Sequence, residues 1–152
     1  MKTYRYISEN TTAHLSLHDC VCSRCYSDGS DLIFDMQWLE VFSSHPHNPT
    51  DKARQSGEGR IVLHGARITH GALISDDAEQ PVCDTIDVQN AEILDFDETT
   101  DAGEYIYNIF AVFHKPHPFD FIKLTVRCAS STVMFDELND PSWFEAECFT
   151  SH

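Results

Sequence analysis

Apolar and polar residues alternate along most of the chain, and a period of two is the pattern of a half-buried β-strand. The clearest case is the segment 18–42, in which Asp28-Gly29 separates two alternating runs, 18–27 and 31–42. Asp-Gly between two such runs predicts a β-hairpin, because a type I′ turn needs positive φ at both central residues. The second run should bury one face, on which lie Leu32, Phe34, Met36 and Trp38.

The position of the turn determines the register of the expected hairpin and the face on which each side chain lies. With Asp28-Gly29 as a two-residue loop, Cys25 lies opposite Leu32 and Cys22 lies opposite Asp35. Cys22 and Cys25 are three residues apart, so on a regular strand they should point to opposite faces.

Six further segments with strand-like alternation are expected at residues 60–64, 66–74, 85–96, 104–114, 119–128 and 132–138. The segment 104–114 is apolar on both faces. Ile109 and Phe113 belong to one face, and Ile106, Phe110 and Val112 belong to the other. A strand of this kind is expected at the centre of a sheet, where both of its faces are covered.

Two segments depart from the strand pattern. Residues 43–60 hold two prolines, two glycines and almost no apolar side chain, which predicts a long loop. Loops of this length in compact domains are usually either functional or disordered. Near the end of the chain, Asp140 and Pro141 resemble the N-cap and first turn of a short helix that would run to about residue 148.

This pattern predicts an all-β, mainly antiparallel fold. We expect a β-sandwich or a jelly-roll-like barrel of about eight strands with a short C-terminal helix. The chain has 152 residues, which is a usual size for one domain, so residues 1–152 are interpreted as a single β-rich domain.

The excess of acidic residues indicates which kinds of partner the protein can attract. Ten basic residues against 25 acidic ones give a formal charge of −15, which disfavours nucleic acids and anionic membranes and favours a basic protein partner. The sequence shows neither a leader-like apolar region nor an apolar stretch of membrane-spanning length, so a cytoplasmic location is expected. The six cysteines are then expected to be mostly reduced.

The cysteine-rich strand offers one candidate metal site. His18, Cys20 and Cys22 share a face of the expected strand, and Asp35 lies opposite Cys22. Imidazole, thiolate and carboxylate are ligands that suit zinc. A second Cys-x-x-Cys element, which a zinc knuckle would need, is absent from the sequence.

No catalytic motif accompanies these residues, since the nucleophile elbow and the glycine-rich phosphate loop are both missing. The first hypothesis is a non-catalytic protein-binding module, whose acidic composition resembles that of immunity and adaptor proteins. Its partner would meet the loop that carries His45, His47, Lys52 and Arg54. The alternatives are a small metal- or ligand-binding domain or enzyme, with its site near His18, Cys20, Cys22 and Asp35, and a subunit of a homo-oligomer.

Overall fold

The computed structural model describes residues 3–142, which form an all-β structure with antiparallel sheets. The elements are β1 (Tyr6–Glu9), the 3-10 turn η1 (Thr12–His14), β2 (Leu15–Ser16), β3 (Val21–Asp28), β4 (Asp31–Met36), β5 (Glu40–Val41), β6 (Arg54–Ser56), β7 (Gly59–His64), β8 (Arg67–Ile74), β9 (Glu79–Pro81), β10 (Asp87–Asp101), β11 (Glu104–Phe113), β12 (Phe121–Cys128), β13 (Ser130–Phe135) and β14 (Leu138–Pro141). No helix among the described residues is long and apolar enough to cross a membrane.

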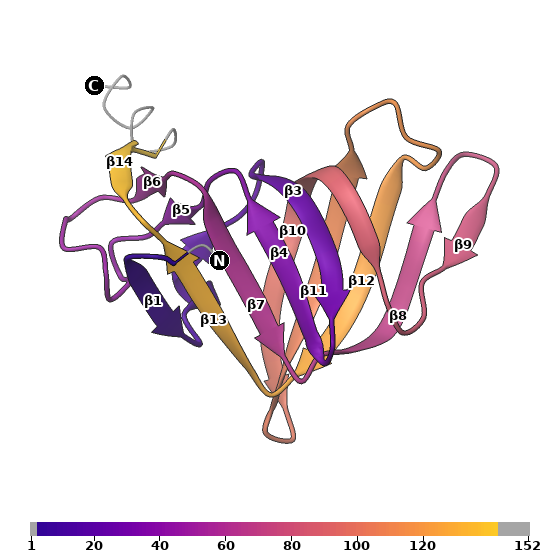
Figure 1. Ribbon diagram of the computed structural model, residues 1–152, viewed down its shortest axis with the longest axis horizontal. Coiled ribbons are helices and arrows are strands. Elements are labelled where there is room, and N and C mark those ends of the chain that lie inside the picture. Colours follow the sequence, from indigo (N-terminus) through magenta and orange to yellow (C-terminus); the bar gives the residue numbers. More distant parts are fainter. Residues whose placement is uncertain (1–2, 143–152) are drawn as a thin grey trace.

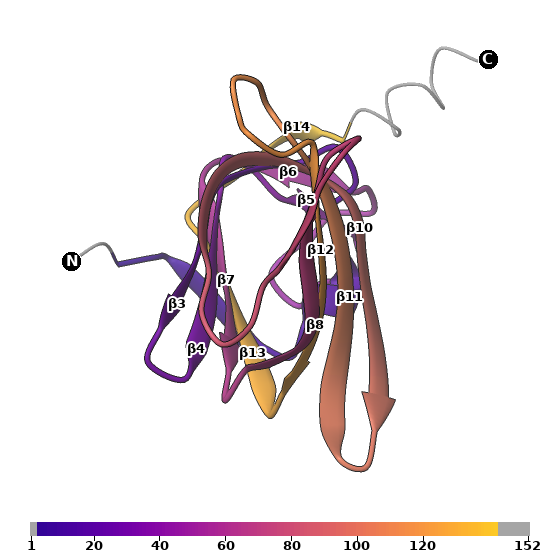
Figure 2. The ribbon, with the colours of Figure 1, turned by 90° about the vertical axis from the view of Figure 1, so that its right-hand side faces the viewer.

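Ten of the strands form one antiparallel sheet in the order β1-β13-β7-β4-β3-β10-β11-β12-β8-β9 (Figure 1). This sheet folds over on itself. Figure 2 shows the result as two layers, with β3, β4 and β7 in one and β11, β12 and β8 in the other. Both layers therefore belong to a single continuous sheet.

Strand β10 joins the two layers. Its first part, Asp87–Glu92, pairs with β3, and the part from Ala91 to Asp101 pairs with β11. The register shifts between Ile93 and Asp95, and Asn90 has a positive φ of 56°. A bulge and a left-handed residue both bend a strand, which allows β10 to pass from one layer to the other.

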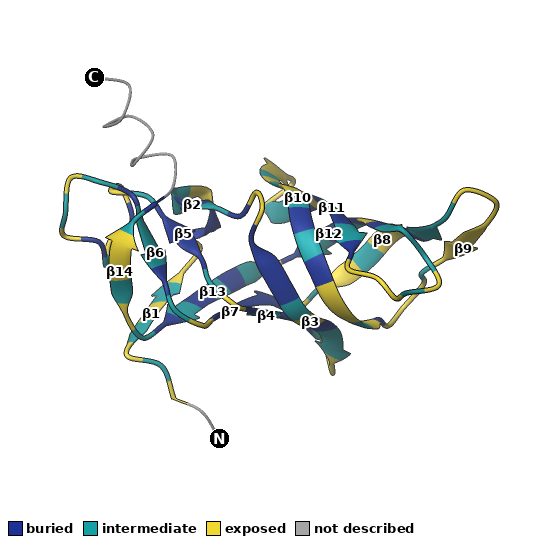
Figure 3. Cartoon of the chain, turned by 90° about the horizontal axis from the view of Figure 1, so that it is seen from above, coloured by how far each residue is buried: buried dark blue, intermediate teal, exposed yellow. Residues whose placement is uncertain are grey.

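A second sheet, in the order β14-β6-β5-β2, lies at the β1 end of the main sheet (Figure 3). Its strands are two to four residues long. Strand β5 precedes the predicted loop 43–60 and β6 lies within it, whereas β2 and β14 come from more distant parts of the chain. The small sheet buries Leu15 and Val41 against the main core.

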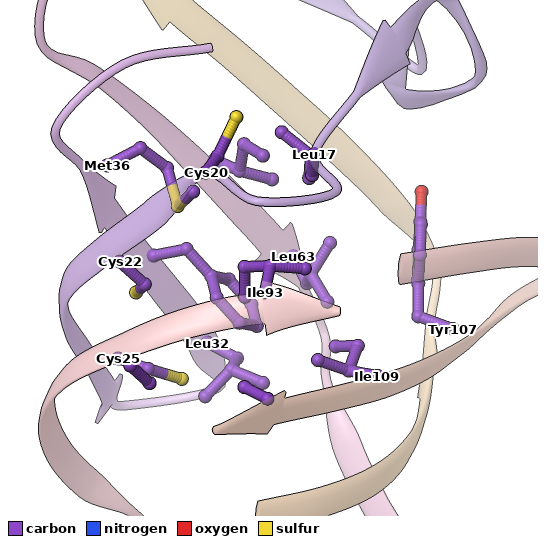
Figure 4. Close-up of a cluster of buried hydrophobic side chains, with 14 of the residues drawn as sticks. Leu17, Cys20, Cys22, Cys25, Leu32, Met36, Leu63, Ile93, Tyr107 and Ile109 are labelled. Carbon is purple, nitrogen blue, oxygen red and sulfur yellow. The ribbon is translucent and has the colours of Figure 1, made fainter. Parts of the chain in front are cut away.

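The core occupies the space between the two layers. Figure 4 shows side chains of one layer, among them Cys22 and Leu32, beside Ile93, Tyr107 and Ile109 of the other. Burial of a large apolar side chain contributes roughly 1.5–3 kcal/mol, so this double layer of apolar residues is the main source of stability.

The strands predicted from alternation are confirmed as β3, β4, β7, β8, β10, β11, β12 and β13. The described chain nevertheless has more strands than the eight expected, because β1, β2, β5, β6, β9 and β14 are too short to show a period. The helix predicted to begin at Asp140 is wrong at its start, since Leu138–Pro141 is a strand paired with β6. The rest of that segment lies outside the described residues.

The first hairpin forms, but its turn lies one residue further along the chain than predicted. Asp28 pairs with Asp31, so the two turn residues are Gly29, with φ of 60°, and Ser30. Glycine with positive φ at the first central position fits a type II′ turn. Cys25 consequently pairs with Phe34 in place of Leu32.

A bulge corrects a second expectation about this hairpin. The register between β3 and β4 shifts between Cys22 and Arg24, which leaves Ser23 as an extra residue. The shift restores Cys22 to the face of Cys25, and both side chains are buried, at 2% and 5% exposure. The prediction that these two cysteines point to opposite faces is therefore wrong.

The two-layer core can be tested with Phe34, which is 1% exposed and lies edge-on to Phe96 at a ring-centroid distance of 5.6 Å. Phe34→Ala should lower the free energy of unfolding by about 3–5 kcal/mol, because it leaves a cavity between the layers. Ile7→Ala, at a residue that is 55% exposed, should change it by less than about 0.5 kcal/mol. Urea unfolding of both variants measures the difference, and equal losses would contradict this account of the core.

Candidate functional site

The cysteines of the predicted metal site belong to the core. Cys20 and Cys22 are 0% and 2% exposed, and the Cys22 thiol donates to the Arg24 carbonyl oxygen at 3.2 Å. Burial raises the pKa of both thiols to about 12. Because the thiolate is the form that attacks electrophiles and binds metals, protonated buried thiols act here as small apolar side chains.

The other two predicted ligands lie at the surface, away from the thiols. His18 is exposed, and its Nδ1 donates to the Leu94 carbonyl oxygen at 2.7 Å. Asp35 lies on the outer face of β4, where it accepts from Arg60 Nε at 2.7 Å. No group of three or more His, Cys, Asp and Glu side chains in residues 3–142 could hold a metal ion. The four residues that the sequence grouped into one metal site are therefore not brought together.

The predicted loop is an ordered structure built around one buried side chain. Asn48 is 5% exposed, and its Nδ2 lies within 3.0–3.2 Å of the carbonyl oxygens of Val41, Phe42 and Lys52. Its Oδ1 accepts from the backbone N–H and the hydroxyl of Thr50. The loop prediction also fails at its end, where residues 54–56 form β6. Contacts of this kind hold the loop in one conformation, so a large rearrangement on binding is not expected.

His45 lies inside this structure and cannot contact a partner. It is 2% exposed, and its ring lies 5.5 Å from that of Phe135. Its Nδ1 accepts from the His47 backbone N–H at 3.0 Å, so Nε2 carries the proton and donates to Ser8 Oγ at 3.2 Å. Burial, followed by the neighbouring His47 and His14, lowers the pKa of His45 to about 4. The residue predicted as a partner contact is a neutral structural histidine.

Two of the other predicted loop residues reach a surface groove. His47 and Arg54 line a hollow of about 410 Å³ together with Arg5, Asp136 and Glu137. Arg54 is held in place, because its Nε donates to Thr50 Oγ1 at 3.1 Å and its Nη1 to the Asn139 carbonyl oxygen at 3.0 Å. Lys52 is half-buried, and its backbone carbonyl accepts from Asn48. The arginines and the carboxylates of this groove balance, so it has no strong preference for one sign of charge.

A surface that the sequence did not indicate as a site lies on the outer side of the β11–β12–β8 layer. We call it the aromatic face and define it as Ile74, Phe110, Val112 and Phe121, all of them half-exposed. The rings of Phe110 and Phe121 are stacked, with centroids 5.2 Å apart and an interplanar angle of 19°. Strand pairing places Val112 beside Phe121 and Phe121 beside Ile74, which makes the cluster contiguous across three strands. All four side chains keep part of their surface accessible to solvent.

Two carboxylates form one border of the aromatic face. Asp95 pairs with Phe110 and Asp97 pairs with Asn108, so both project from the outer side of β10. Both are exposed, and neither forms an ion pair with another residue in the described range. They line two shallow hollows, of about 330 Å³ toward His18 and about 120 Å³ toward Phe110. Acidic side chains therefore adjoin the half-exposed aromatic pair, and Lys123 lies with them in the smaller hollow.

The apolar residues on both faces of β11 are the feature of the sequence that corresponds to this face. Strand β11 is apolar on both sides, which predicted a strand covered on both sides. The strand is indeed central in the sheet, between β10 and β12. Its inner residues Tyr107 and Ile109 are buried, whereas Phe110 and Val112 are only half-buried. The strand is therefore central, as predicted, but its outer apolar residues are only partly covered.

The protonation of His45 gives a test of this part of the structure. The unfolded state binds a proton at the ordinary histidine pKa of 6.5, and the folded state binds it only near pH 4. The contribution of His45 to the free energy of unfolding is therefore fully present above pH 6.5. It is lost as the pH falls towards 4, and the loss amounts to about 3 kcal/mol. An NMR titration of the His45 ring should give a pKa of about 4 in the folded protein. A pKa near 6.5 would contradict the buried neutral ring.

Comparison of the chain with protein-family models, with curated proteins and with solved structures finds no match.

Proposed function

We propose that this domain is a protein-binding module and that its partner docks on the aromatic face. The observation that carries the proposal is the stacked Phe110–Phe121 pair on the outer side of the β11–β12–β8 layer, where both rings are half-exposed. Contiguous apolar side chains at a surface are the common mark of an interaction site. Aromatic residues are enriched at the centres of protein interfaces, where they contribute most of the binding energy.

The charge distribution indicates the kind of partner. Asp95 and Asp97 border the aromatic face and form no ion pair with another described residue, and Lys123 lines the same hollow. The whole chain carries a formal charge of −15. A field of this sign accelerates the encounter with a basic protein and disfavours nucleic acid and anionic membranes. The proposed partner is therefore a protein with a basic rim around an apolar contact.

The positions of the reactive side chains support a module without chemistry of its own. The buried thiols of Cys20 and Cys22 have pKa values raised to about 12, and the neutral ring of His45 is enclosed by the loop. Each of these groups has a structural role that accounts for its shifted pKa. The alternative of a metal site at His18, Cys20, Cys22 and Asp35 receives no support, because the side chains do not converge.

Loop 43–60 has a different part in this proposal from the one that the sequence suggested. His45 and Asn48 bind the loop to the core, so the loop shapes one end of the main sheet. Only His47 and Arg54 of the predicted contact residues line a groove. We therefore place the principal docking surface on the opposite layer.

Substitution of the stacked pair tests the proposal. Phe110→Ser/Phe121→Ser should weaken capture of the partner by about 30-fold or more, since loss of an interface hot spot costs about 2 kcal/mol or more. The partner is first isolated with the wild-type domain, and its affinity is then measured by calorimetry with both proteins purified. Ile7→Ser is the matched control, because Ile7 is exposed on the opposite layer. Its affinity should equal that of the wild type.

Two results would contradict the proposal. One is equal affinity for the wild type and the folded double variant. The other is self-association through the aromatic face, detected as a dimer in light scattering that Phe110→Ser/Phe121→Ser converts to a monomer. In the second case the face would be an interface between copies of this chain.

The two carboxylates should act on the rate of association. Asp95→Asn/Asp97→Asn should slow association with a basic partner and reduce its dependence on salt, with a smaller effect on dissociation. Stopped-flow or surface-based kinetics at two salt concentrations measures this. An unchanged salt dependence would remove these residues from the docking surface.

A further inference from the structure

A hollow lies on the other layer, beside the bulge of β3. It has a volume of about 550 Å³ and is lined mainly by Tyr4, Ser23, Asp35, Gln37, Glu58 and Arg60. Small-molecule sites usually have volumes of about 300–1,000 Å³, so the size suits a ligand of one or two rings. We call it the bulge cavity. Bulges are frequent beside functional sites, because the extra residue redirects side chains.

The floor of the bulge cavity presents donors and acceptors side by side. Arg60 uses only Nε to reach Asp35 Oδ1, at 2.7 Å. This leaves the terminal nitrogens of Arg60 and Oδ2 of Asp35 without a hydrogen-bond partner among residues 3–142. The side-chain amide of Gln37, the exposed residue that follows β4, also makes no hydrogen bond with a described residue. Ser23 donates to the Asp35 carbonyl oxygen at 2.9 Å, which fixes the bulge.

The charges of the cavity limit the ligand class. Asp35 and Arg60 form an ion pair, so their charges balance, and the whole chain is strongly acidic. Phosphates and carboxylates are therefore disfavoured, and Arg60 disfavours a simple cation. Neutral hydroxyl groups remain, since each can donate to a carboxylate and accept from a guanidinium at once. Tyr4 adds an aromatic side chain to the wall of the cavity.

From this arrangement we propose that the bulge cavity binds a neutral saccharide. Adjacent hydroxyl groups of the sugar bridge Asp35 Oδ2 and the terminal nitrogens of Arg60, and the Gln37 amide binds a third hydroxyl. The cavity is on the outer side of the β3–β4–β7 layer, whereas the aromatic face is on the outer side of the β11–β12–β8 layer. The saccharide site is therefore independent of the proposed protein-binding function.

An NMR titration of the full chain with a panel of neutral mono- and disaccharides tests this inference. At least one sugar should shift the backbone amides of Ser23, Asp35, Gln37 and Arg60 and leave those of Phe110 and Phe121 unchanged. Asp35→Asn and Gln37→Ala should each weaken binding about tenfold, in line with the loss of one hydrogen bond to the sugar. Gln37 is exposed, so Gln37→Ala tests the site without disturbing the core.

Asp31→Asn is the control, since Asp31 lies on the same face of β4 but outside the bulge cavity, where it contacts His64. Its affinity for the sugar should equal that of the wild type. The inference is overturned if no sugar in the panel shifts the cavity amides, or if inorganic phosphate or glutamate binds there more tightly than any sugar. It is also overturned if Gln37→Ala and Asp35→Asn, both folded, retain full affinity.

Discussion

The bend of β10 is the constraint on which the rest of the structure depends. Because this strand pairs with β3 at one end and with β11 at the other, one sheet supplies both layers. The bulge between Ile93 and Asp95 and the left-handed Asn90 allow the change of direction. Ile93 remains buried at the bend, at 2% exposure, so the layers stay joined by apolar contacts where the backbone turns.

The bend also determines which surfaces are left for function. Folding the sheet directs one face of every long strand into the core and the other face to the outside. Side chains on the inner faces are buried in the core, as Phe34 and Tyr107 are, and are not accessible to a partner. The outer faces differ: that of β3, β4 and β7 carries the Asp35–Arg60 pair beside a hollow, and that of β11, β12 and β8 carries stacked phenylalanines. The two proposals rest on this difference between the layers.

The long strands were predictable because an apolar–polar alternation over six or more residues suits a half-buried strand and does not suit a helix. The exact register of the first hairpin could not be predicted. It depends on Gly29 as the first turn residue and on Ser23 as an extra residue in β3, and no sequence pattern indicates either feature. That single bulge reversed the expected relation of Cys22 and Cys25, and it removed the basis of the metal site.

The candidate sites were less predictable than the fold, because they depend on contacts between distant segments. His45 is buried by Phe135, which lies ninety residues away in the chain, so its neighbours in sequence suggested a solvated loop. The expected charge effect on partners stays a prediction. The double apolar pattern of β11 was visible, but only the arrangement of the layers shows which of its faces is open.

Photo-crosslinking from the aromatic face measures most directly whether this face is the docking surface. A photoreactive phenylalanine analogue replaces Asn108, which is exposed beside Asp97, and in a second protein it replaces Thr132 on the outer face of the opposite layer. The account predicts a specific partner adduct from position 108 and none from position 132. An adduct from position 132 alone would contradict it, as would equal adducts from both.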